Sequence, residues 1–349
     1  MKVLVTGAAG FIGSAICRQL AAGGHQVVAV DLMIPQAHGC AVPPVGVHGL
    51  DVRDAESWTD LLEGVDAVCH QAALVGAGVR VSDLPVYAAH NDLGTAALLS
   101  AMHVAGVAGL VLASSMVVYG EGRYSCAEHG PQLPGPRAVA SLEAGRFDHR
   151  CAACATPLEW DLVDEDAALE PRSGYAASKV AQEHYASAWA RQSGGSVVAL
   201  RYHNVYGPQM PRDTPYSGVA AMFRSSLERG EAPRVFEDGR QMRDFVHVDD
   251  VARANVLALG AVTRTAGFRA YNVCSGRPVA IGEVAALVAE GASSPRVPVV
   301  TGGFRAGDVR HVVASPARAA DELGFVASVV PEDGLRAFAT EPLRESPAG

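Results

Sequence analysis

The sequence predicts an α/β protein built on a doubly wound parallel sheet of the Rossmann type. Short apolar runs rich in β-branched residues alternate with longer alanine-rich stretches of helical spacing, and a glycine-rich turn follows the first run. The runs show no polar alternation, as expected for strands covered on both faces. Their alternation with helices indicates βαβ units, and ligands of such sheets bind at the carboxyl ends of the strands.

The expected elements follow one another from the first residues. We expect strands at 3–5, 27–30, 67–70, 110–113 and 197–200, and helices at 13–22, 58–62, 91–103 and 175–192. Two regions break this rhythm, one between 121 and 171 and one that begins near 204 and contains a helical patch at 219–229.

These breaks divide the chain. We expect a Rossmann domain over 1–203 with an insertion at 121–171, and a smaller C-terminal substrate-binding lobe over 204–340. Residues 244–275 are expected to return to the Rossmann domain, and 341–349 to form a loose tail.

Composition narrows the classes of function. The chain has 349 residues, 49% of them hydrophobic, and a formal net charge of −9, so it offers no broad basic face for nucleic acid. No apolar run approaches the roughly 20 residues of a membrane span, and the start has no signal-peptide architecture. We therefore expect a cytoplasmic protein without a membrane partner, whose seven cysteines are reduced thiols or metal ligands.

The glycine-rich turn indicates a dinucleotide site. Gly7 permits a tight turn, Gly10 lets the backbone approach a pyrophosphate, and Gly13 lets the following helix pack on the strand. Asp31 ends the second expected strand, where a carboxylate accepts from both ribose hydroxyls and repels a 2′-phosphate, which favours NAD over NADP. Asp51 and Val52 lie directly after a further strand, which follows 27–30 and precedes 67–70. They are placed to contact the adenine or to form an ordinary strand-end turn.

A tyrosine and a lysine one helical turn apart form the candidate catalytic pair. Tyr175 and Lys179 lie on the same face of the expected helix. A nearby ammonium and the charge of an oxidised nicotinamide favour the phenolate, which lowers the pKa of the tyrosine. Ser115, at the end of the strand 110–113, is placed to hold the same substrate oxygen.

In this combination the chain resembles the extended short-chain dehydrogenase/reductase family, which contains the NAD-dependent nucleotide-sugar epimerases and dehydratases. The resemblance extends from residue 1 to about residue 325, and its motifs occur in the order of the family. The matching segments are 6–13, 51–52, 68–73, 91–95, 114–120, 175–179, 201–208, 243–250 and 305–308.

The resemblance implies further site residues and partners. Beyond the residues above, those implied to contact NAD are Phe11, Ile12, Ala72, Ala73, Asn91, Ser114 and Tyr202. Those implied to contact the nucleoside-diphosphate sugar are Ser115, Asn204, Arg243, Arg305 and Asp308, and the forked guanidinium of arginine suits phosphate oxygens. The family commonly forms homodimers through the helices expected at 91–103 and 175–192.

The residues after Ser115 select among the reactions of the family. The shared first step is oxidation of a sugar hydroxyl, usually at C4, after which the ketone is reduced from its other face, loses water or loses carbon dioxide. Dehydratases of the family place Asp-Glu after the catalytic hydroxyl residue, whereas this chain has Met116 and Val117, which transfer no protons. This favours an epimerase. A dehydrogenase or ketoreductase, a dehydratase, and an inactive NAD-binding scaffold are the alternatives.

The insertion carries two short pairs of metal-ligand residues. Cys126 and His129 form one pair, and Cys151 and Cys154 form the other about 20 residues later. Four such ligands suit a tetrahedral structural zinc that staples a flap near the substrate mouth. The alternative is three incidental thiols and a surface histidine. The remaining cysteines are expected to be small buried residues: Cys17, Cys40, Cys69 and Cys274.

Overall fold

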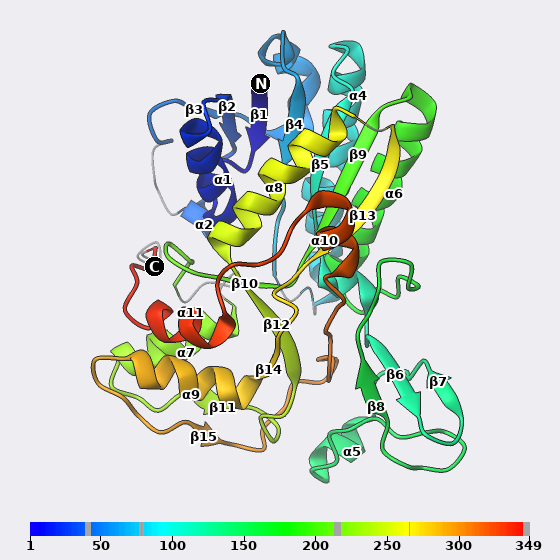
Figure 1. The fold of residues 1–349 in the computed structure, drawn as a ribbon, viewed down its shortest axis with the longest axis vertical. Coiled ribbons are helices and arrows are strands. Elements are labelled where there is room, and N and C mark those ends of the chain that lie inside the picture. The colour runs from blue at the N-terminus through cyan, green and yellow to red at the C-terminus, as the bar shows by residue number, and fades with distance from the viewer. Residues whose placement is uncertain (39–42, 77, 79, 213–217, 265, 345–349) are drawn as a thin grey trace.

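A computed structural model describes residues 1–38, 43–76, 78, 80–212, 218–264 and 266–344. Figure 1 shows a large sheet with helices on both faces, a smaller lobe beside its lower end, and a separate small sheet that projects from the same end. Cys40 lies outside the described residues. Over the described ranges, no helix combines the length and the apolar composition that crossing a membrane requires.

The large sheet is parallel and has seven strands, in the order β3-β2-β1-β4-β5-β9-β13. Each of the five expected strands is present, at its expected length or longer. The strands are β1 (Lys2–Thr6), β2 (Gln26–Asp31), β3 (Val47–Gly49), β4 (Ala67–His70), β5 (Gly109–Ser115), β9 (Ser196–Tyr202) and β13 (Gly267–Val273). The chain reverses direction across the sheet between β1 and β4, which confirms the doubly wound prediction.

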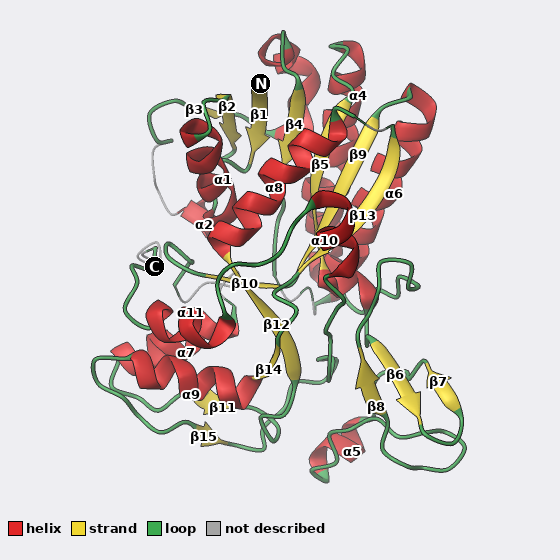
Figure 2. Ribbon diagram, viewed as in Figure 1, coloured by secondary structure: helices red, strands yellow, loops and turns green. Residues whose placement is uncertain are grey.

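Helices cover both faces of this sheet (Figure 2). The first face carries α1 (Phe11–Ala22), α8 (Val248–Val262) and α10 (Ala317–Leu323). The second carries the 3₁₀ segment η1 (Val52–Leu62), α4 (Gly94–Val104) and α6 (Gly174–Ser193). The helix expected at 58–62 forms the end of η1. Two residues of η1 with non-helical dihedrals, Asp54 and Trp58, interrupt its 3₁₀ turns.

The helix expected at 91–103 is part of a longer run. The run begins with η2 (Val81–Asp83) and α3 (Leu84–Tyr87), and the π-helical η3 (Ala88–Leu93) connects them to α4. Two further short elements flank the cofactor side of the sheet: α2 (Pro35–His38) after β2, and the 3₁₀ turn η4 (Met116–Tyr119) after β5.

The smaller lobe has its own apolar core around Tyr206, Phe245 and Phe338. One of its sheets has the order β10-β12-β14, and the other pairs β11 with β15. Its strands are β10 (Asn204–Tyr206), β11 (Arg234–Val235), β12 (Met242–His247), β14 (Pro278–Ala280) and β15 (Val299–Val300). Its helices are α7 (Val219–Glu228), α9 (Ile281–Gly291) and α11 (Pro331–Phe338).

The prediction of a loose tail from residue 341 is wrong for residues 341–344. Leu343 is buried in the core of the small lobe, and the backbone N–H of Arg344 donates to the carbonyl of Met210. An apolar side chain and a paired backbone therefore hold this segment in place. Residues 345–349 lie outside the described part of the chain.

The insertion forms an antiparallel sheet of three short strands in the order β7-β6-β8. These are β6 (Arg123–Cys126), β7 (Gly130–Gln132) and β8 (Glu159–Asp161), and a single short helix, α5 (Val139–Glu143), lies between β7 and β8. In Figure 1 the insertion extends away from the large sheet on the side where the strands end. It is therefore on the same side as the ligand-binding edge.

Candidate active site and metal cluster

A cavity of about 390 Å³ lies at the carboxyl ends of the central strands of the large sheet. Sixteen of the residues expected to bind cofactor or substrate line it: Gly7, Gly10, Phe11, Ile12, Gly13, Asp31, Asp51, Val52, Ala72, Ala73, Ser114, Ser115, Tyr175, Lys179, Tyr202 and Asn204. Most of them lie at or just after strand ends, because parallel strands present their carboxyl ends at one edge. The fold thus brings distant motifs to one wall.

The glycine turn between β1 and α1 leaves no room for side chains. Gly7 has φ of +66°, and a Cβ there would lie 2.7 Å from the backbone nitrogen of Ala72. A Cβ on Gly13 would lie 2.0 Å from the carbonyl oxygen of Gly7. The turn therefore packs tightly against the strand-end loop after β4, and it exposes backbone at the start of α1, where phosphates are favoured.

Asp31 is held as a carboxylate at the end of β2. It accepts hydrogen bonds from the backbone N–H of Ala9 (3.0 Å) and of Met33 (2.8 Å), and His38 Nε2 lies 3.3 Å from its Oδ1. Burial opposes ionisation, but these partners hold the pKa of Asp31 below its usual value. The sequence prediction missed His38, because its position depends on the short helix α2.

Arg344 lines the same cavity although it follows the glycine turn by more than 300 residues. Its guanidinium donates to the carbonyl oxygen of Ala9 at 2.8 Å. Burial lowers its pKa. Spacing could not predict this residue, because it lies in the segment expected to be loose.

Two of the expected cofactor residues use their polar atoms within the protein. The Asp51 carboxylate accepts from the backbone N–H of Arg53 (2.9 Å) and from its guanidinium. Asn91 does not line the cavity: it is fully buried, and its amide exchanges hydrogen bonds with the backbone of Leu74 at 2.7 and 3.0 Å. Asn91 therefore holds the loop after β4 in place. Its side chain does not face the cavity, so the structure does not favour the direct cofactor contact that the resemblance implies.

Tyr175 and Lys179 lie in the first turns of α6, whose N-cap is Ser173. The Lys179 ammonium donates to the carbonyl oxygen of Ala113 at 2.9 Å, and its Nζ lies 5.9 Å from the centre of the Tyr175 ring. Both side chains line the cavity, as does Ser115, whose Oγ accepts from the backbone N–H of Val117.

Burial dominates the protonation of this pair in the protein alone. It raises the pKa of Tyr175 above its usual value, a rise that the hydrogen bond with Ser115 opposes, and it lowers the pKa of Lys179 to about 7. The lowered tyrosine pKa expected from the sequence is therefore not a property of the protein alone. A dry pocket disfavours both charged forms, so the ammonium does not offset the burial of the phenol.

Ser114 belongs to a buried network below the cavity. Its hydroxyl donates to Glu183, whose carboxylate accepts two hydrogen bonds from Arg201 at 2.9 and 2.8 Å. Arg201 also donates to the hydroxyl of Tyr119 and to the backbone of Glu165. This network ties α6 to β5 and β9, and so sets the height of Tyr175 and Lys179 above the sheet.

Two neighbouring polar side chains at the cavity wall have buried atoms without partners. Within the described part of the chain, neither ring nitrogen of His203 has a hydrogen-bond partner, and Oδ1 of Asn204 accepts no hydrogen bond. Burial lowers the pKa of His203 to about 3, so its imidazole is neutral. Both residues line the cavity, and such atoms point to a polar ligand. Asn204 was predicted from the sequence, whereas His203 was not.

The remaining three residues expected to bind substrate do not line this cavity. Arg243 donates to the backbone carbonyls of Met242, Val309 and Arg310. The Arg305 guanidinium lies 5.3 Å from the centre of the Phe236 ring. Asp308 is close enough to both arginines for their charges to lower its pKa, although burial raises it overall. The three residues thus cluster in the small lobe, apart from the cavity wall.

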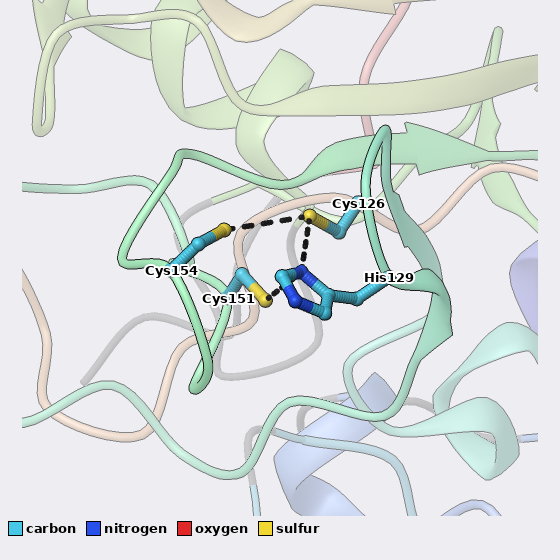
Figure 3. A group of neighbouring side chains, drawn as sticks. All are labelled: Cys126, His129, Cys151 and Cys154. Carbon is cyan, nitrogen blue, oxygen red and sulfur yellow. Dashed lines mark hydrogen bonds between the residues drawn. The ribbon is translucent and has the colours of Figure 1, made fainter.

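The insertion brings its four expected metal ligands together (Figure 3). Their ligand atoms all lie within 4.8 Å of one another. Cys126 Sγ lies 3.5 Å from His129 Nδ1 and 3.7 Å from Cys154 Sγ, and Cys151 Sγ lies 3.6 Å from His129 Nδ1. The sulfur separation is far beyond a disulfide bond. Two turns, one after β6 and one before β8, therefore converge on one point.

Of the other cysteines, three are described and all are free thiols. Cys69 and Cys274 are buried, and Cys17, within α1, is partly buried against the core of the large sheet. Burial raises the pKa of Cys17 to about 11 and that of Cys69 to about 12, so both are protonated and unreactive at neutral pH.

The chain is similar to known enzymes over almost its whole length. A dTDP-L-rhamnose 4-epimerase of Burkholderia thailandensis is 35% identical over 334 residues, which cover 93% of this chain and 90% of that protein. A UDP-glucose 4-epimerase of Mycolicibacterium smegmatis is 31% identical and covers 96% of each chain. The structure of a Thermus thermophilus UDP-glucose 4-epimerase in complex with NAD is 32% identical, with a TM-score of 0.76 over 97% of this chain and 98% of that one.

The profile of the NAD dependent epimerase/dehydratase family matches residues 3–137 and 151–274. The match is interrupted at 138–150, within the insertion, so the segment before Cys151 is where this chain departs from the family pattern. The glycine turn, the strand-end serines and the Tyr175–Lys179 pair all fall within the matched residues. The chain belongs to the NAD dependent epimerase/dehydratase family.

Proposed function

We propose that the protein is an NAD-dependent 4-epimerase of a nucleoside-diphosphate sugar. One observation carries the proposal: Tyr175, Lys179 and Ser115 face the same cavity as the glycine turn and Asp31. A phenol, an ammonium and a hydroxyl beside a dinucleotide site are the groups needed to oxidise and re-form a secondary alcohol.

The residues present fit NAD. The tight glycine turn presents bare backbone at the start of α1, which suits a pyrophosphate, and the Asp31 carboxylate suits two ribose hydroxyls. The low pKa of Asp31 keeps its charge at neutral pH, which disfavours a 2′-phosphate. NAD held there by the glycine turn and Asp31 would supply a reversible hydride acceptor for the sugar carbon.

The side chains account for the proton movements. Tyr175 removes the proton from the sugar hydroxyl as the carbon is oxidised and gives it back when the ketone is reduced. Ser115 donates to the same oxygen and holds it beside the phenol. Lys179, with a pKa of about 7, carries a positive charge in part of the population near neutral pH and stabilises the phenolate.

The cavity wall also favours epimerisation over elimination. Met116 lines the cavity directly after Ser115, and Val117 follows it. Neither side chain transfers a proton, so elimination of water from the keto intermediate is disfavoured and the ketone would instead be reduced again by hydride. The names of the relatives in dTDP-sugar and UDP-sugar chemistry support a pyrimidine nucleoside diphosphate as the carrier of the sugar.

The proposal is tested by incubating the purified protein with a panel of dTDP- and UDP-sugars in deuterated water and following the products by NMR. We expect inversion at C4 with no solvent deuterium at any carbon, and no inversion with Tyr175→Phe. Deuterium at a carbon next to the reacting centre would indicate enolisation, and a released keto sugar would indicate a dehydrogenase.

We also propose that Cys126, His129, Cys151 and Cys154 hold a structural zinc. A tetrahedral zinc with bonds of about 2.3 Å to sulfur and about 2.1 Å to nitrogen has sulfur–sulfur edges of about 3.8 Å and sulfur–nitrogen edges of about 3.6 Å. The contacts of 3.7, 3.5 and 3.6 Å between the ligand atoms agree with those edges. Four protein ligands leave no position for substrate. Stoichiometric zinc in protein purified without added metal supports the site, and its absence refutes it.

Oligomeric state and compartment complete the proposal. Along the run 81–104, Leu84, Val86, Leu93 and Val104 are exposed, and this run packs against α6, which supports a homodimer through these helices. Light scattering of Leu93→Asp tests it, since a dimer of unchanged mass contradicts the interface. The free thiols support a cytoplasmic location, which cell fractionation tests.

A further inference from the structure

We propose that the metal-bearing insertion positions the nucleotide-binding loop of the small lobe, and that the buried triad Arg137, Glu237 and Arg310 transmits its position. Binding of the nucleoside diphosphate would then depend on the metal, whereas binding of NAD would not. This inference rests on the proposed function, because it takes 301–308 as the loop that meets the nucleoside diphosphate.

The metal ligands lie next to the segments that contact the lobe. Cys151 lies two residues after His149, and Cys126 lies two residues after Tyr124 in β6. The Tyr124 and His149 rings are 4.9 Å apart, edge to face, and His149 Nε2 lies 3.1 Å from Glu121. A shift of the metal-binding turns therefore moves the segment 147–149.

The apolar core beside the metal-binding turns of the insertion is small. Its apolar cluster consists of Tyr124, Cys126, Cys151 and Leu158, with Cys154 packed against them. Two of the four buried members are themselves metal ligands. A cluster this small gives the two metal-binding turns little apolar support, so a metal is the expected staple for them.

Arg137 is the first link to the lobe. Its guanidinium donates to both carboxylate oxygens of Glu237, at 2.9 and 2.8 Å, and to the backbone carbonyls of Phe147 (3.0 Å) and Asp308 (2.7 Å). Its side chain is only 4% exposed. The buried Arg137 side chain thus joins the insertion to two loops of the small lobe, one after β11 and one after β15.

Arg310 is the second link and meets the same carboxylate from the lobe. It donates to Glu237 at 2.9 Å, to Asp238 at 2.7 and 2.9 Å, and to Asp148 of the insertion at 2.8 Å. Its side chain is 1% exposed and lies 5.9 Å from the centre of the Phe147 ring. The segment 147–148 is therefore held by two arginines at once.

Glu237 connects the two arginines to the proposed nucleotide-binding loop, 301–308. It is a non-glycine residue with φ of +53°, a backbone conformation kept only where surrounding contacts fix it. Its N–H donates to the carbonyl of Gly303 at 2.7 Å, and the neighbouring Phe236 ring carries the Arg305 guanidinium. Arg137, through the carbonyl of Asp308, holds the other end of the same loop.

The geometry of the triad predicts which property changes. Arg305 and Asp308 lie in the small lobe. The glycine turn, Asp31 and the Tyr175–Lys179 pair lie on the large sheet, and over the described residues they share no hydrogen bond or ion pair with the triad. Loosening the insertion should therefore weaken nucleoside-diphosphate binding and leave NAD binding intact. Arg137 is a positioning residue in this account.

The test compares the full-length protein with the double variant Cys151→Ser/Cys154→Ser, with Arg137→Ala and Arg137→Lys, and with Arg146→Ala as the matched control. Arg146 is an exposed arginine of the same insertion. Zinc content is measured by mass spectrometry, and the dissociation constants of dTDP, UDP and NAD are measured by calorimetry. Limited proteolysis reports whether the insertion stays folded.

We expect the cysteine variant to lose zinc and gain protease sensitivity within 121–171, with dTDP or UDP binding weakened roughly tenfold and NAD binding within about twofold of the unaltered protein. Arg137→Ala should keep its zinc and show the same selective weakening, Arg137→Lys should recover part of it, and Arg146→Ala should change nothing.

Unchanged nucleoside-diphosphate affinity in zinc-free protein, or in Arg137→Ala, would overturn the inference, as would an equal loss of NAD binding. If the unaltered protein binds NAD and zinc but neither dTDP nor UDP, the proposed substrate class fails instead. The two failures are therefore distinguished by the unaltered protein alone.

Discussion

Lys179 Nζ lies 2.9 Å from the carbonyl oxygen of Ala113 and 5.9 Å from the centre of the Tyr175 ring. One residue at the end of β5 thus holds the lysine beside the phenol. The geometry of this proposed catalytic pair depends on how α6 packs on the sheet as well as on the four-residue spacing within the helix.

Tyr175→Phe should lower kcat by roughly a hundredfold to ten-thousandfold, because the phenol that transfers the proton is removed. NAD affinity should change little. The matched control is Tyr185→Phe, an exposed tyrosine on the same helix. Steady-state kinetics with the active nucleotide sugar measure the effect, and a phenylalanine variant with ordinary turnover would exclude Tyr175 as the acid/base.

Lys179 makes stability depend on pH. Its pKa is about 7 in the folded protein and 10.5 in a free side chain, so the unfolded chain binds this proton more tightly and the free energy of unfolding rises with pH between these values. Lys179→Met should therefore stabilise the protein at pH 6.5, by about 1–2 kcal/mol. The gain should shrink as the pH approaches 10, and denaturant titrations at several pH values would contradict this if the difference stayed constant.

Asp31→Asn should weaken NAD binding by about tenfold to a hundredfold, because a neutral amide replaces a charged acceptor. It should also narrow the preference for NAD over NADP, since the charge that repels a 2′-phosphate is lost. Asp54→Asn, at an exposed carboxylate near the site, is the control. Calorimetry with both dinucleotides measures the ratio, and an unchanged ratio would remove Asp31 from cofactor selection.

Glu183→Gln should destabilise the protein by about 3–5 kcal/mol, because Arg201 is left as a buried cation with a weakened partner. Both side chains of the pair are at most 4% exposed. In Glu290→Gln, which removes one partner of an exposed pair with Arg336, the change should stay below about 1 kcal/mol. Equal effects in the two variants, measured by chemical denaturation, would contradict the structural role of the network.

His203→Phe should raise the free energy of unfolding by about 1 kcal/mol, since two desolvated ring nitrogens without partners are removed. At the same time it should raise KM for the nucleotide sugar, because a neutral imidazole at the cavity wall no longer meets the ligand. His103→Phe, at an exposed site, controls for the added ring. A destabilised variant with normal KM would mean that His203 has a purely structural partner.

The cofactor half of the site could be predicted from the sequence because its residues lie at fixed offsets from strand ends. Gly7, Gly13 and Asp31 follow directly from the β-α-β rhythm, and Tyr175 and Lys179 from the pitch of a helix. Their positions require only local geometry and one rule about the sheet. The same holds for the two pairs of candidate metal ligands in the insertion, because each pair is closed by a short turn.

Other features depend on contacts between distant segments, which spacing does not encode. His38 reaches Asp31 only because α2 folds back over the end of β2, and Asn91 turned out to hold a loop instead of facing the cavity. The pKa of Tyr175 also differs from the expectation, because burial outweighs a neighbouring cation, and burial is a property of the whole fold. The contact between Arg137 and Glu237 joins the insertion to the small lobe across 100 residues of sequence, so local spacing could not predict it.

The hydrogen bond from Arg344 to the carbonyl of Ala9 has a consequence for synthesis of the protein on the ribosome. The glycine turn emerges early and the arginine that closes over it is translated 335 residues later. The cavity beside the glycine turn is therefore open while the residues in between are being made, and it gains this part of its wall only after residue 344 has been translated. A deletion or insertion next to Arg344 would remove this contact even though it lies far from the glycine turn in the sequence.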